Sequence, residues 1–289
     1  MKLSIITINY NNAEGLRRTL ASVAAQSYKQ IEHIIVDGGS TDESVAIIRE
    51  YELANRSCRD NFIKKRNPFF QHSIIWSSEP DNGIYNAINK GIRKATGAYV
   101  QILNSGDLLI SDDIIERMMM ILEDRNYPEL LYGNAVDVNE GKKLSSHGPG
   151  IEYSLWQLYK GTYPHDSTFF RRDMFSNERY GLYDESLKIV SDWKWYLQAI
   201  GLGDIKPEYV DIDVTLFDVT GISSTNKELD AKERRHVIES ILPPAILTDL
   251  DNYEFLITQY KRLKRHHLWS IVYFVERTLF KLEKWKILR

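Results

Sequence analysis

The chain has 289 residues, of which 43% are hydrophobic and 27% are charged, and its formal net charge at pH 7 is −3. This balance is typical of a globular protein with a real core, and it excludes a disordered chain, a multi-span membrane protein and a uniformly basic nucleic-acid-binding protein. The single cysteine, Cys58, excludes an intramolecular disulfide and a cysteine-rich zinc module. The length predicts one large domain with an appendage.

Neither end of the chain has the pattern of a targeting or spanning segment. The N-terminal apolar run, Leu3–Ile8, is shorter than the about 7–15 residues of a secretory signal. The longest uncharged stretch near the C-terminus, Leu268–Val275, is far shorter than the about 20 residues that cross a bilayer as a helix. We therefore expect a cytoplasmic protein, peripheral on the inner face of the cell membrane if it contacts a membrane.

Apolar, β-branched runs alternate with helical periodicity over the first hundred residues. We expect strands at 3–8, 31–36, 74–76 and 98–103, and helices at 13–27, 41–53 and 82–94. Strands that alternate with helices predict an α/β fold with a mostly parallel sheet flanked by helices. Polar loops follow all four strands, and ligands of such sheets bind beyond the carboxyl ends of the strands.

Two segments break this alternation. Residues 55–72 are long for a helix-to-strand connection, which usually takes about 2–6 residues, and they are rich in lysine and arginine. Beyond about residue 226 the strand pattern disappears and charged, helical sequence follows. The second change predicts a domain boundary near residue 225.

The loop Asn104–Asp107 ends the fourth predicted strand with one carboxylate next to a glycine. A lone carboxylate at a strand end suits Mg²⁺ or Mn²⁺ that is also bound by phosphate oxygens, because such ions use few protein ligands. The alternative is an Asx turn that opens the next helix. The residues alone leave both interpretations open.

Four segments follow or overlap the ends of the predicted strands: Ser4–Asn11, Val36–Asp42, Ser78–Gly91 and Leu103–Asp107. They stand in the order seen in family 2 inverting glycosyltransferases, and the chain resembles that family over roughly residues 1–220. Three later segments are similar to the family's acceptor-side histidine segment, its catalytic-base segment and the loop that closes over the donor: Pro164–Thr168, Ile189–Trp193 and Gly221–Ser224.

The resemblance implies a GT-A fold, which is Rossmann-like, with a C-terminal helical tail. It implies a catalytic domain at 1–225, with a nucleotide-sugar-binding half at about 1–107 and an acceptor half at 108–225, followed by a helical extension at 226–289. The implied enzyme is a hexosyl- or N-acetylhexosaminyltransferase of polysaccharide biosynthesis. It moves a sugar from a nucleotide-diphosphate sugar, with UDP as the expected nucleotide, to a hydroxyl of a glycan or lipid-linked acceptor.

The resemblance also assigns roles to residues. Asp107 is the implied ligand of a divalent cation, Mn²⁺ or Mg²⁺, and Asp192 is the implied base that takes the proton of the acceptor hydroxyl. His165 is a second candidate catalytic residue. The candidate donor-binding residues are Thr7, Asn9, Tyr10, Asp37, Asp81, Asn86, Lys90, Asn104 and Ser105.

Each of these roles has a simpler alternative. Asp192 could cap a helix at 193–200, Asp81 could cap the helix that follows it, and His165 could be an ordinary loop residue. The chain also departs from the family, because Asn104 and Gly106 stand where carboxylates often occur. Gly38 stands where many relatives have a second aspartate that contacts uracil.

Two competing functions are considered. A dinucleotide-binding dehydrogenase also begins with alternating strands and helices, but the first loop, Asn9–Asn12, lacks the glycines of that fingerprint. A non-catalytic sugar-nucleotide-binding or scaffold protein of the same fold is the stronger alternative. The carboxylates at 107 and 192 favour an enzyme. We expect no nucleic-acid partner.

The C-terminal segment is basic and amphipathic. Residues 261–289 contain nine Lys or Arg and two Glu, a net charge of +7, so the preceding 260 residues carry −10. Leu268, Val272, Val275, Leu279 and Leu282 recur at helical spacing, with Arg277, Lys281 and Lys284 on another face and Trp269 and Trp285 near the ends. Such a helix can lie on an anionic membrane surface. The alternatives are packing on the catalytic domain or on a second subunit in a homodimer.

Overall fold

The computed structural model describes residues 1–59, 72–139, 142–148, 154–221, 225–265, 271–275 and 277–279. The chain divides into two compact units, Met1–Arg234 and Arg235–Arg289. We call the first the catalytic unit, after the catalytic domain that the family resemblance implies for this part of the sequence. Most of the predicted basic segment at 55–72 lies outside the described residues. So do residues 222–224 of the predicted loop over the donor, and Leu268, Trp269, Lys281, Leu282, Lys284 and Trp285 of the tail.

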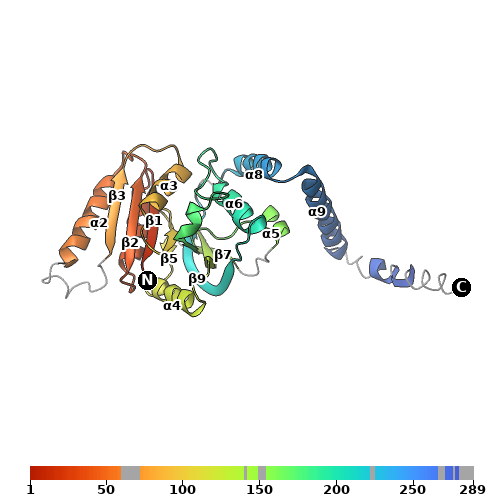
Figure 1. The fold of residues 1–289 in the computed structure, drawn as a ribbon, viewed down its shortest axis with the longest axis horizontal. Coiled ribbons are helices and arrows are strands. Elements are labelled where there is room, and N and C mark those ends of the chain that lie inside the picture. The colour runs from red at the N-terminus through yellow and green to blue at the C-terminus, as the bar shows by residue number, and fades with distance from the viewer. Residues whose placement is uncertain are drawn as a thin grey trace. The chain divides into compact units, whose positions relative to one another are not determined.

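The first half of the catalytic unit has the predicted alternation of strands and helices (Figure 1). The strands carry continuous buried runs, as expected for a sheet covered on both faces. In chain order the elements are β1 (Leu3–Asn9), α1 (Ala13–Ala24), β2 (Ile31–Asp37), α2 (Ser44–Arg59), β3 (Ser73–Ser78), α3 (Ile84–Lys94) and β4 (Tyr99–Ile102).

The second half adds shorter elements to the same sheet. They are β5 (Leu108–Leu109), α4 (Ile114–Asp124), β6 (Leu130–Asn139), β7 (Lys142–His147), α5 (Leu155–Lys160), β8 (Thr168–Arg171), the 3₁₀ turn η1 (Arg172–Ser176), α6 (Ser191–Tyr196), the π-helical turn η2 (Leu197–Gly201) and β9 (Glu208–Asp218). Helix α8 (Lys227–Ile241) follows and crosses into the second unit, which also holds α9 (Pro244–Arg265).

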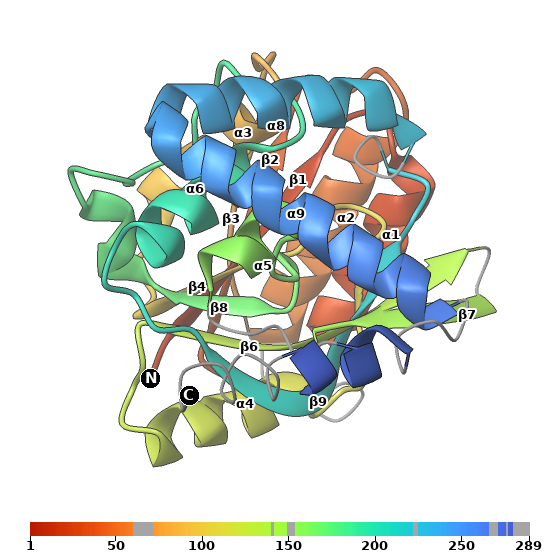
Figure 2. The same cartoon turned by 90° about the vertical axis from the view of Figure 1, so that its right-hand side faces the viewer.

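One sheet runs through the catalytic unit in the order β3-β2-β1-β4-β8-β6-β9-β5, with β7 paired to β6. The predicted strands β3, β2, β1 and β4 are parallel to one another, which confirms the α/β prediction. Strand β8 pairs antiparallel with both β4 and β6 (Figure 2). Strand β9 pairs parallel with β6 and antiparallel with β5. The second half therefore continues the sheet with mixed pairing.

The register of the parallel strands aligns their carboxyl ends. Asn9 is the register partner of Asp37, and Asp37 is the partner of Ser78. The backbone N–H of Ser105 donates to the carbonyl of Ile8 at 3.1 Å, which brings the loop after β4 to the same edge. The polar loops singled out in the sequence therefore meet at one edge of the sheet, as predicted.

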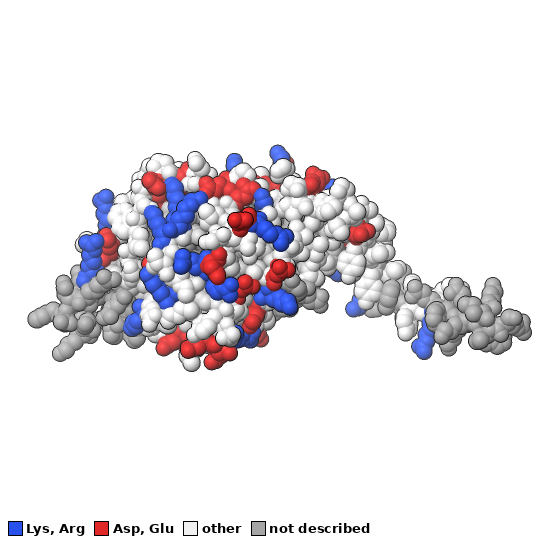
Figure 3. Space-filling model, in the orientation of Figure 1, with Lys and Arg blue, Asp and Glu red and all other residues white. Residues whose placement is uncertain are grey.

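Helices cover both faces of the parallel strands. A buried cluster formed by Leu16, Leu20, Ile35, Ile47, Ile48 and Tyr51 joins α1 and α2 to β2. Helix α3 covers the opposite face. Its Gly91 lies against Ile6 of β1, and the register partner of Ile6 on β2 is Ile34. Ile34 and the Ile35 of the buried cluster are adjacent, and adjacent residues of a strand point to opposite faces of the sheet. On the face of the catalytic unit drawn in Figure 3, the described acidic and basic side chains are intermixed.

The second unit exposes apolar side chains on helical segments. Phe255 and Leu256 on α9 are each 62% exposed, and Phe274 is 71% exposed. Arg262, Lys264 and Arg265 lie in the last turn of α9. Among the described residues, no helix combines the length and the apolar character that crossing a bilayer requires.

The contact between α3 and β1 gives a test of the packing. A Cβ at Gly91 would lie 2.4 Å from Cγ2 of Ile6, so Gly91→Ala forces the helix off the sheet. We expect a net loss of roughly 1–2 kcal/mol in the free energy of unfolding, because overpacking costs more than alanine returns as a better helix former. Urea unfolding followed by tryptophan fluorescence measures it.

Gly161→Ala is the matched control, since among the described residues a Cβ there meets only the Gln157 carbonyl, at 3.6 Å, and the backbone is extended. It should change stability by less than about 0.5 kcal/mol. Equal stability of the two variants would contradict the close packing of α3 on β1.

Candidate active site

Two cavities lie side by side at the carboxyl edge of the sheet. Cavity A, of about 910 Å³, is lined by residues that include Asn9, Tyr10, Gly38, Asp81, Asn104, Ser105, Asp107 and Asp218. Cavity B, of about 480 Å³, is lined by residues that include Tyr85, Tyr163, His165, Asp166, Asp192 and Trp193. Ile84, Asn104 and Phe217 line both cavities, so they form a shared wall.

Asp107 lies in cavity A and is only 4% exposed. Its Oδ1 accepts a hydrogen bond of 3.0 Å from the backbone N–H of Asp218. Burial raises the pKa of Asp107 well above its usual range, and the nearby carboxylate of Asp166 adds to this effect. The Asp107 carboxylate accepts from the backbone at the end of β9. The N–H of Leu109, two residues after Asp107, donates to the Ser22 hydroxyl instead, so the Asx-turn interpretation was wrong.

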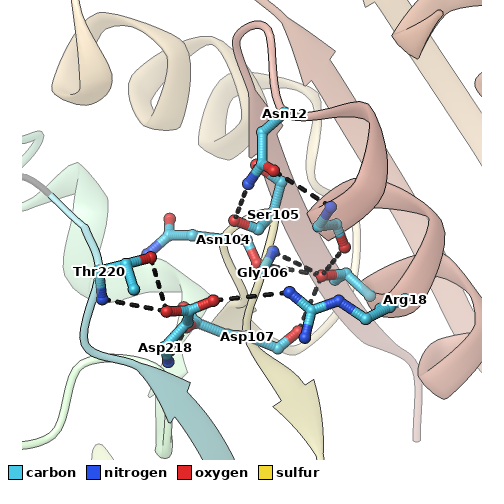
Figure 4. Close-up of polar contacts among 10 residues, drawn as sticks. Asn12, Arg18, Asn104, Ser105, Gly106, Asp107, Asp218 and Thr220 are labelled. Atoms are coloured by element: carbon cyan, nitrogen blue, oxygen red, sulfur yellow. Dashed lines mark hydrogen bonds and ion pairs between the residues drawn. The ribbon is translucent and has the colours of Figure 1, made fainter. Parts of the chain in front are cut away.

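The loop that carries Asp107 is held by helix α1 (Figure 4). The Thr19 hydroxyl donates to the Asp107 carbonyl at 2.8 Å and accepts from the Gly106 N–H at 2.9 Å. Gly106 has a φ of 113°, which disfavours any residue with a Cβ. The Asn12 amide donates to the Ser105 carbonyl at 2.9 Å. Asp107 is therefore fixed by backbone contacts on both sides.

Asp218 is a site residue that the sequence analysis missed. Its carboxylate accepts from the N–H and hydroxyl of Thr220 at 3.0 and 2.7 Å, and it lies 3.5 Å from a guanidinium nitrogen of Arg18. Figure 4 shows Arg18 and Thr220 approaching it from α1 and from the chain after β9. A carboxylate at the end of the apolar run Val214–Phe217 was the available clue.

Asp37 organises the first wall of cavity A without lining it. Its fully buried carboxylate accepts from the Asn9 amide at 2.8 Å and from the Ser40 and Ser78 hydroxyls at 2.6 Å each. Burial alone would raise the pKa of Asp37, but the hydrogen bonds from Ser40, Ser78 and Asn9 outweigh it and the pKa is lowered. Asp37 is thus an ionised anchor for the loops after β1 and β2.

Gly38 leaves room for a different carboxylate. A Cβ at Gly38 would lie 2.5 Å from Oδ2 of Asp81 and 3.3 Å from the Tyr10 ring. Asp81 therefore occupies the space into which a side chain at 38 would extend. The N-cap of α3 is Gly83, and Oδ1 of Asp81 accepts a hydrogen bond of 2.9 Å from the Gly83 N–H. Asp81 therefore bonds to the start of α3, and its Oδ2 is the oxygen that faces Gly38.

Asp192 lies in cavity B, in the first turn of α6. The helix begins at Ser191 with Val190 as N-cap, so the interpretation of Asp192 as the cap was wrong. The Tyr85 hydroxyl lies 2.8 Å from Oδ1 of Asp192 and 2.5 Å from the Ile189 carbonyl. Burial, with Asp192 adding to it, raises the pKa of Tyr85 well above its usual range, so the phenol keeps its proton as a donor.

His165 lies in cavity B within a group of aromatic rings. Its Nε2 forms a hydrogen bond of 2.8 Å with the Tyr183 hydroxyl, and its ring meets those of Tyr183 and Phe170 edge-on. Burial lowers the pKa of His165, so the imidazole is neutral near pH 7. A neutral imidazole can orient a hydroxyl group of a ligand by hydrogen bonding.

Besides Asp37, three predicted donor-binding residues line neither cavity. The Thr7 hydroxyl bonds to the buried ring of His33 at 3.0 Å, and the Asn86 amide donates to Glu185 at 2.6 Å. The Lys90 ammonium pairs with Glu79 at 3.1 Å. The other six, Asn9, Tyr10, Asp37, Asp81, Asn104 and Ser105, surround cavity A or hold its walls.

The residues of cavity A fit a divalent cation that is bound together with phosphate. Asn104 Oδ1 is buried and has no hydrogen-bond partner among the described residues, and it stands at the wall near Asp107. Carboxylate and amide oxygens are ligands that Mg²⁺ and Mn²⁺ accept. Within the described residues, no group of three or more His, Cys, Asp or Glu forms a cation cage, so phosphate oxygens would complete the shell.

Comparison with known proteins agrees with this architecture. The Glycosyl transferase family 2 model matches residues 4–179. The chain is 32% identical over 225 residues to an uncharacterised glycosyltransferase of Mycobacterium tuberculosis, covering 77% of each chain. It is 25% identical over 224 residues to a PGL/p-HBAD biosynthesis glycosyltransferase of Mycobacterium bovis, covering 77% of this chain and 79% of that one.

Solved structures share the fold at lower identity. S. aureus TarS 1-349 in complex with UDP-GlcNAc has a TM-score of 0.60 and 18% identity, over 78% of this chain and 61% of that one. A mannosyltransferase of Pyrobaculum calidifontis with GDP-Man and Mn²⁺ has a TM-score of 0.54 and 18% identity, over 81% and 60%. This chain thus spans less than two thirds of either solved chain, and the likeness confirms the predicted GT-A fold. On the family match and these relatives, the chain belongs to glycosyltransferase family 2 and is a glycosyltransferase.

Proposed function

We propose that this glycosyltransferase moves a sugar from a nucleotide-diphosphate sugar, with inversion, to a hydroxyl of a glycan or lipid-linked acceptor in polysaccharide biosynthesis. The observation that carries the proposal is the shared wall of the two cavities. Asp107 lies in cavity A, Asp192 lies in cavity B, and Asn104 lines both. A donor in cavity A and an acceptor in cavity B would therefore meet at that wall.

The chemistry assigned to the chain's residues is an in-line displacement at the anomeric carbon. Asp192 takes the proton of the acceptor hydroxyl as that oxygen attacks, which is the task of a general base. A divalent cation, when bound, neutralises charge that develops on the diphosphate leaving group. Asp107 and Asn104 would hold the cation, while His165 and the aromatic rings of cavity B orient the acceptor.

UDP is the nucleotide we propose, with GDP as the alternative. TarS has been solved with UDP and UDP-GlcNAc, and the Pyrobaculum mannosyltransferase with GDP-Man. Cavity A presents Asp81 in the space next to Gly38, so a carboxylate is available there to accept a hydrogen bond from a base. Tyr10, 66% exposed, offers an aromatic ring at the rim of the cavity.

We propose that the second unit contacts the inner face of an anionic membrane, with a homodimer partner as the alternative. Exposed apolar side chains on α9, at 271–275 and at Leu279 would enter the interface, and the basic last turn of α9 would meet the lipid headgroups. This arrangement would place the enzyme in the cytoplasm, next to lipid-linked acceptors.

A donor screen tests the proposed activity. Hydrolysis of several UDP- and GDP-sugars in the presence of Mn²⁺ should identify one donor that the wild-type protein turns over. Asp192→Asn should lower kcat for that donor by roughly 10²–10⁴-fold, because the base is lost. Asp124→Asn on the exposed face of α4 is the control and should leave kcat unchanged. Turnover of no donor would favour the non-catalytic scaffold alternative.

Metal removal tests the role of Asp107. Wild-type protein treated with EDTA should bind UDP weakly in calorimetry, and added Mn²⁺ should restore tight binding, because cation and diphosphate bind together. Asp107→Asn keeps an oxygen that can accept from the Asp218 N–H, so it should fold normally. It should, however, show little gain in UDP affinity from Mn²⁺. A gain equal to that of the wild type would rule out Asp107 as a ligand.

Vesicle binding tests the membrane proposal. Replacing Arg262, Lys264 and Arg265 by Glu should abolish cosedimentation with vesicles of anionic phospholipid, because each basic residue near such a surface contributes about 1 kcal/mol. The control is Lys142→Glu with Lys143→Glu, on exposed residues of β7 in the catalytic unit. If the wild-type protein ignores anionic vesicles, the membrane proposal is wrong.

A further inference from the structure

The backbone just before Asp192 is held by one carboxylate. The N–H groups of Lys188, Ile189 and Val190 donate to the side chain of Glu233 on α8, at 2.8, 2.9 and 3.3 Å. Hydrogen bonds from backbone N–H groups to an ionised carboxylate are stronger than those between neutral groups. The three residues immediately precede α6, whose first turn carries Asp192.

The same backbone segment is also held from the side of the sheet. The Ile189 carbonyl accepts from the Tyr85 hydroxyl of α3, and that hydroxyl also reaches the Asp192 carboxylate. Both polar backbone groups of Ile189 are therefore bonded, the N–H to α8 and the carbonyl to α3. The side chain of Ile189 is 6% exposed. The position of Asp192 thus depends on two helices that are far apart in the sequence.

A second contact from α8 falls on the other side of Asp192. The Arg234 guanidinium lies 4.5 Å from the ring centroid of Trp193, and its Nε pairs with Asp230 at 3.2 Å. The Trp193 indole N–H donates to the Leu158 carbonyl at 2.6 Å, which fixes the ring. Two adjacent residues of α8, Glu233 and Arg234, therefore contact the chain just before and just after Asp192.

We propose that Glu233 is a positioning residue for the base: it acts through the 188–190 backbone to hold Asp192 at the acceptor side of the site. The proposal rests on the proposed role of Asp192. It gives α8 a part in the reaction, although the family match ends at residue 179. Asp218, whose backbone N–H donates to the Asp107 carboxylate, precedes α8 in the chain. The Asp107 carboxylate and the backbone just before Asp192 are therefore both bonded by residues between 218 and 233.

Glu233→Gln tests the proposal, because one acceptor oxygen is replaced by an amide that faces backbone N–H groups. We expect kcat for hydrolysis of the donor found in the screen to fall roughly 10–100-fold, since small misplacements of a catalytic group have effects of this size. The KM for the donor, and the Kd for UDP or GDP with Mn²⁺, should stay within about threefold of the wild type. Glu233→Asp keeps both oxygens and should retain more of kcat.

Glu228→Gln is the matched control, because it makes the same substitution on an exposed residue of the same helix. It should leave kcat unchanged. The proposal is overturned if both Glu233 variants keep kcat within about threefold of the wild type. It is also overturned if they lose nucleotide binding together with turnover, since that would indicate a general structural role. If wild-type protein turns over no donor, the proposed function fails first and this proposal fails with it.

Discussion

The hydrogen bond from the Asp218 backbone to the Asp107 carboxylate joins the two halves of the catalytic unit. It becomes possible because β5 pairs with β9, Leu108 with Leu216, directly beside the two aspartates. Losing this hydrogen bond would leave a buried oxygen of Asp107 unsatisfied, which costs about 1–3 kcal/mol. The end of β9 is therefore held against the loop that follows β4, and Phe217 becomes part of the wall shared by both cavities.

The other site contacts follow from where β9 ends. The chain leaves Asp218 and enters α8, whose Glu233 accepts from the backbone before Asp192. Helix α3 contributes from the opposite direction through Tyr85. The candidate metal ligand lies on the loop after β4 and the candidate base lies in the first turn of α6, and both are held by residues of the chain between Asp218 and Glu233. The same stretch of chain therefore positions Asp107 on the donor side and Asp192 on the acceptor side of the site.

Much of the parallel half could be predicted from the sequence. The runs at 3–8 and 31–36 are apolar and β-branched, and they became β1 and β2 because both of their faces are buried. The polar residues after them were expected to meet, and the register places Asn9 beside Asp37 and Asp37 beside Ser78. Local pattern was sufficient here, because parallel strands with short connections align their carboxyl ends.

The remaining parts of the site depend on long-range contacts that a local pattern does not encode. Asp218 meets Arg18 and Asp107 only through the pairing of β9, and Glu233 lies in sequence that resembled an ordinary charged helix. The capping interpretation of Asp192 was wrong for a similar reason. Helix α6 begins at Ser191 and not at residue 193 as predicted. The Glu233 carboxylate accepts from the backbone N–H groups just before this start.

The central claim is a single displacement in which Asp192 activates the attacking oxygen. The most direct measurement is the anomeric configuration of the sugar first released from the donor, recorded by proton NMR before mutarotation. Single displacement predicts that the configuration is opposite to that of the sugar in the donor. Release of the sugar with its original configuration would contradict single displacement and the proposed role of Asp192.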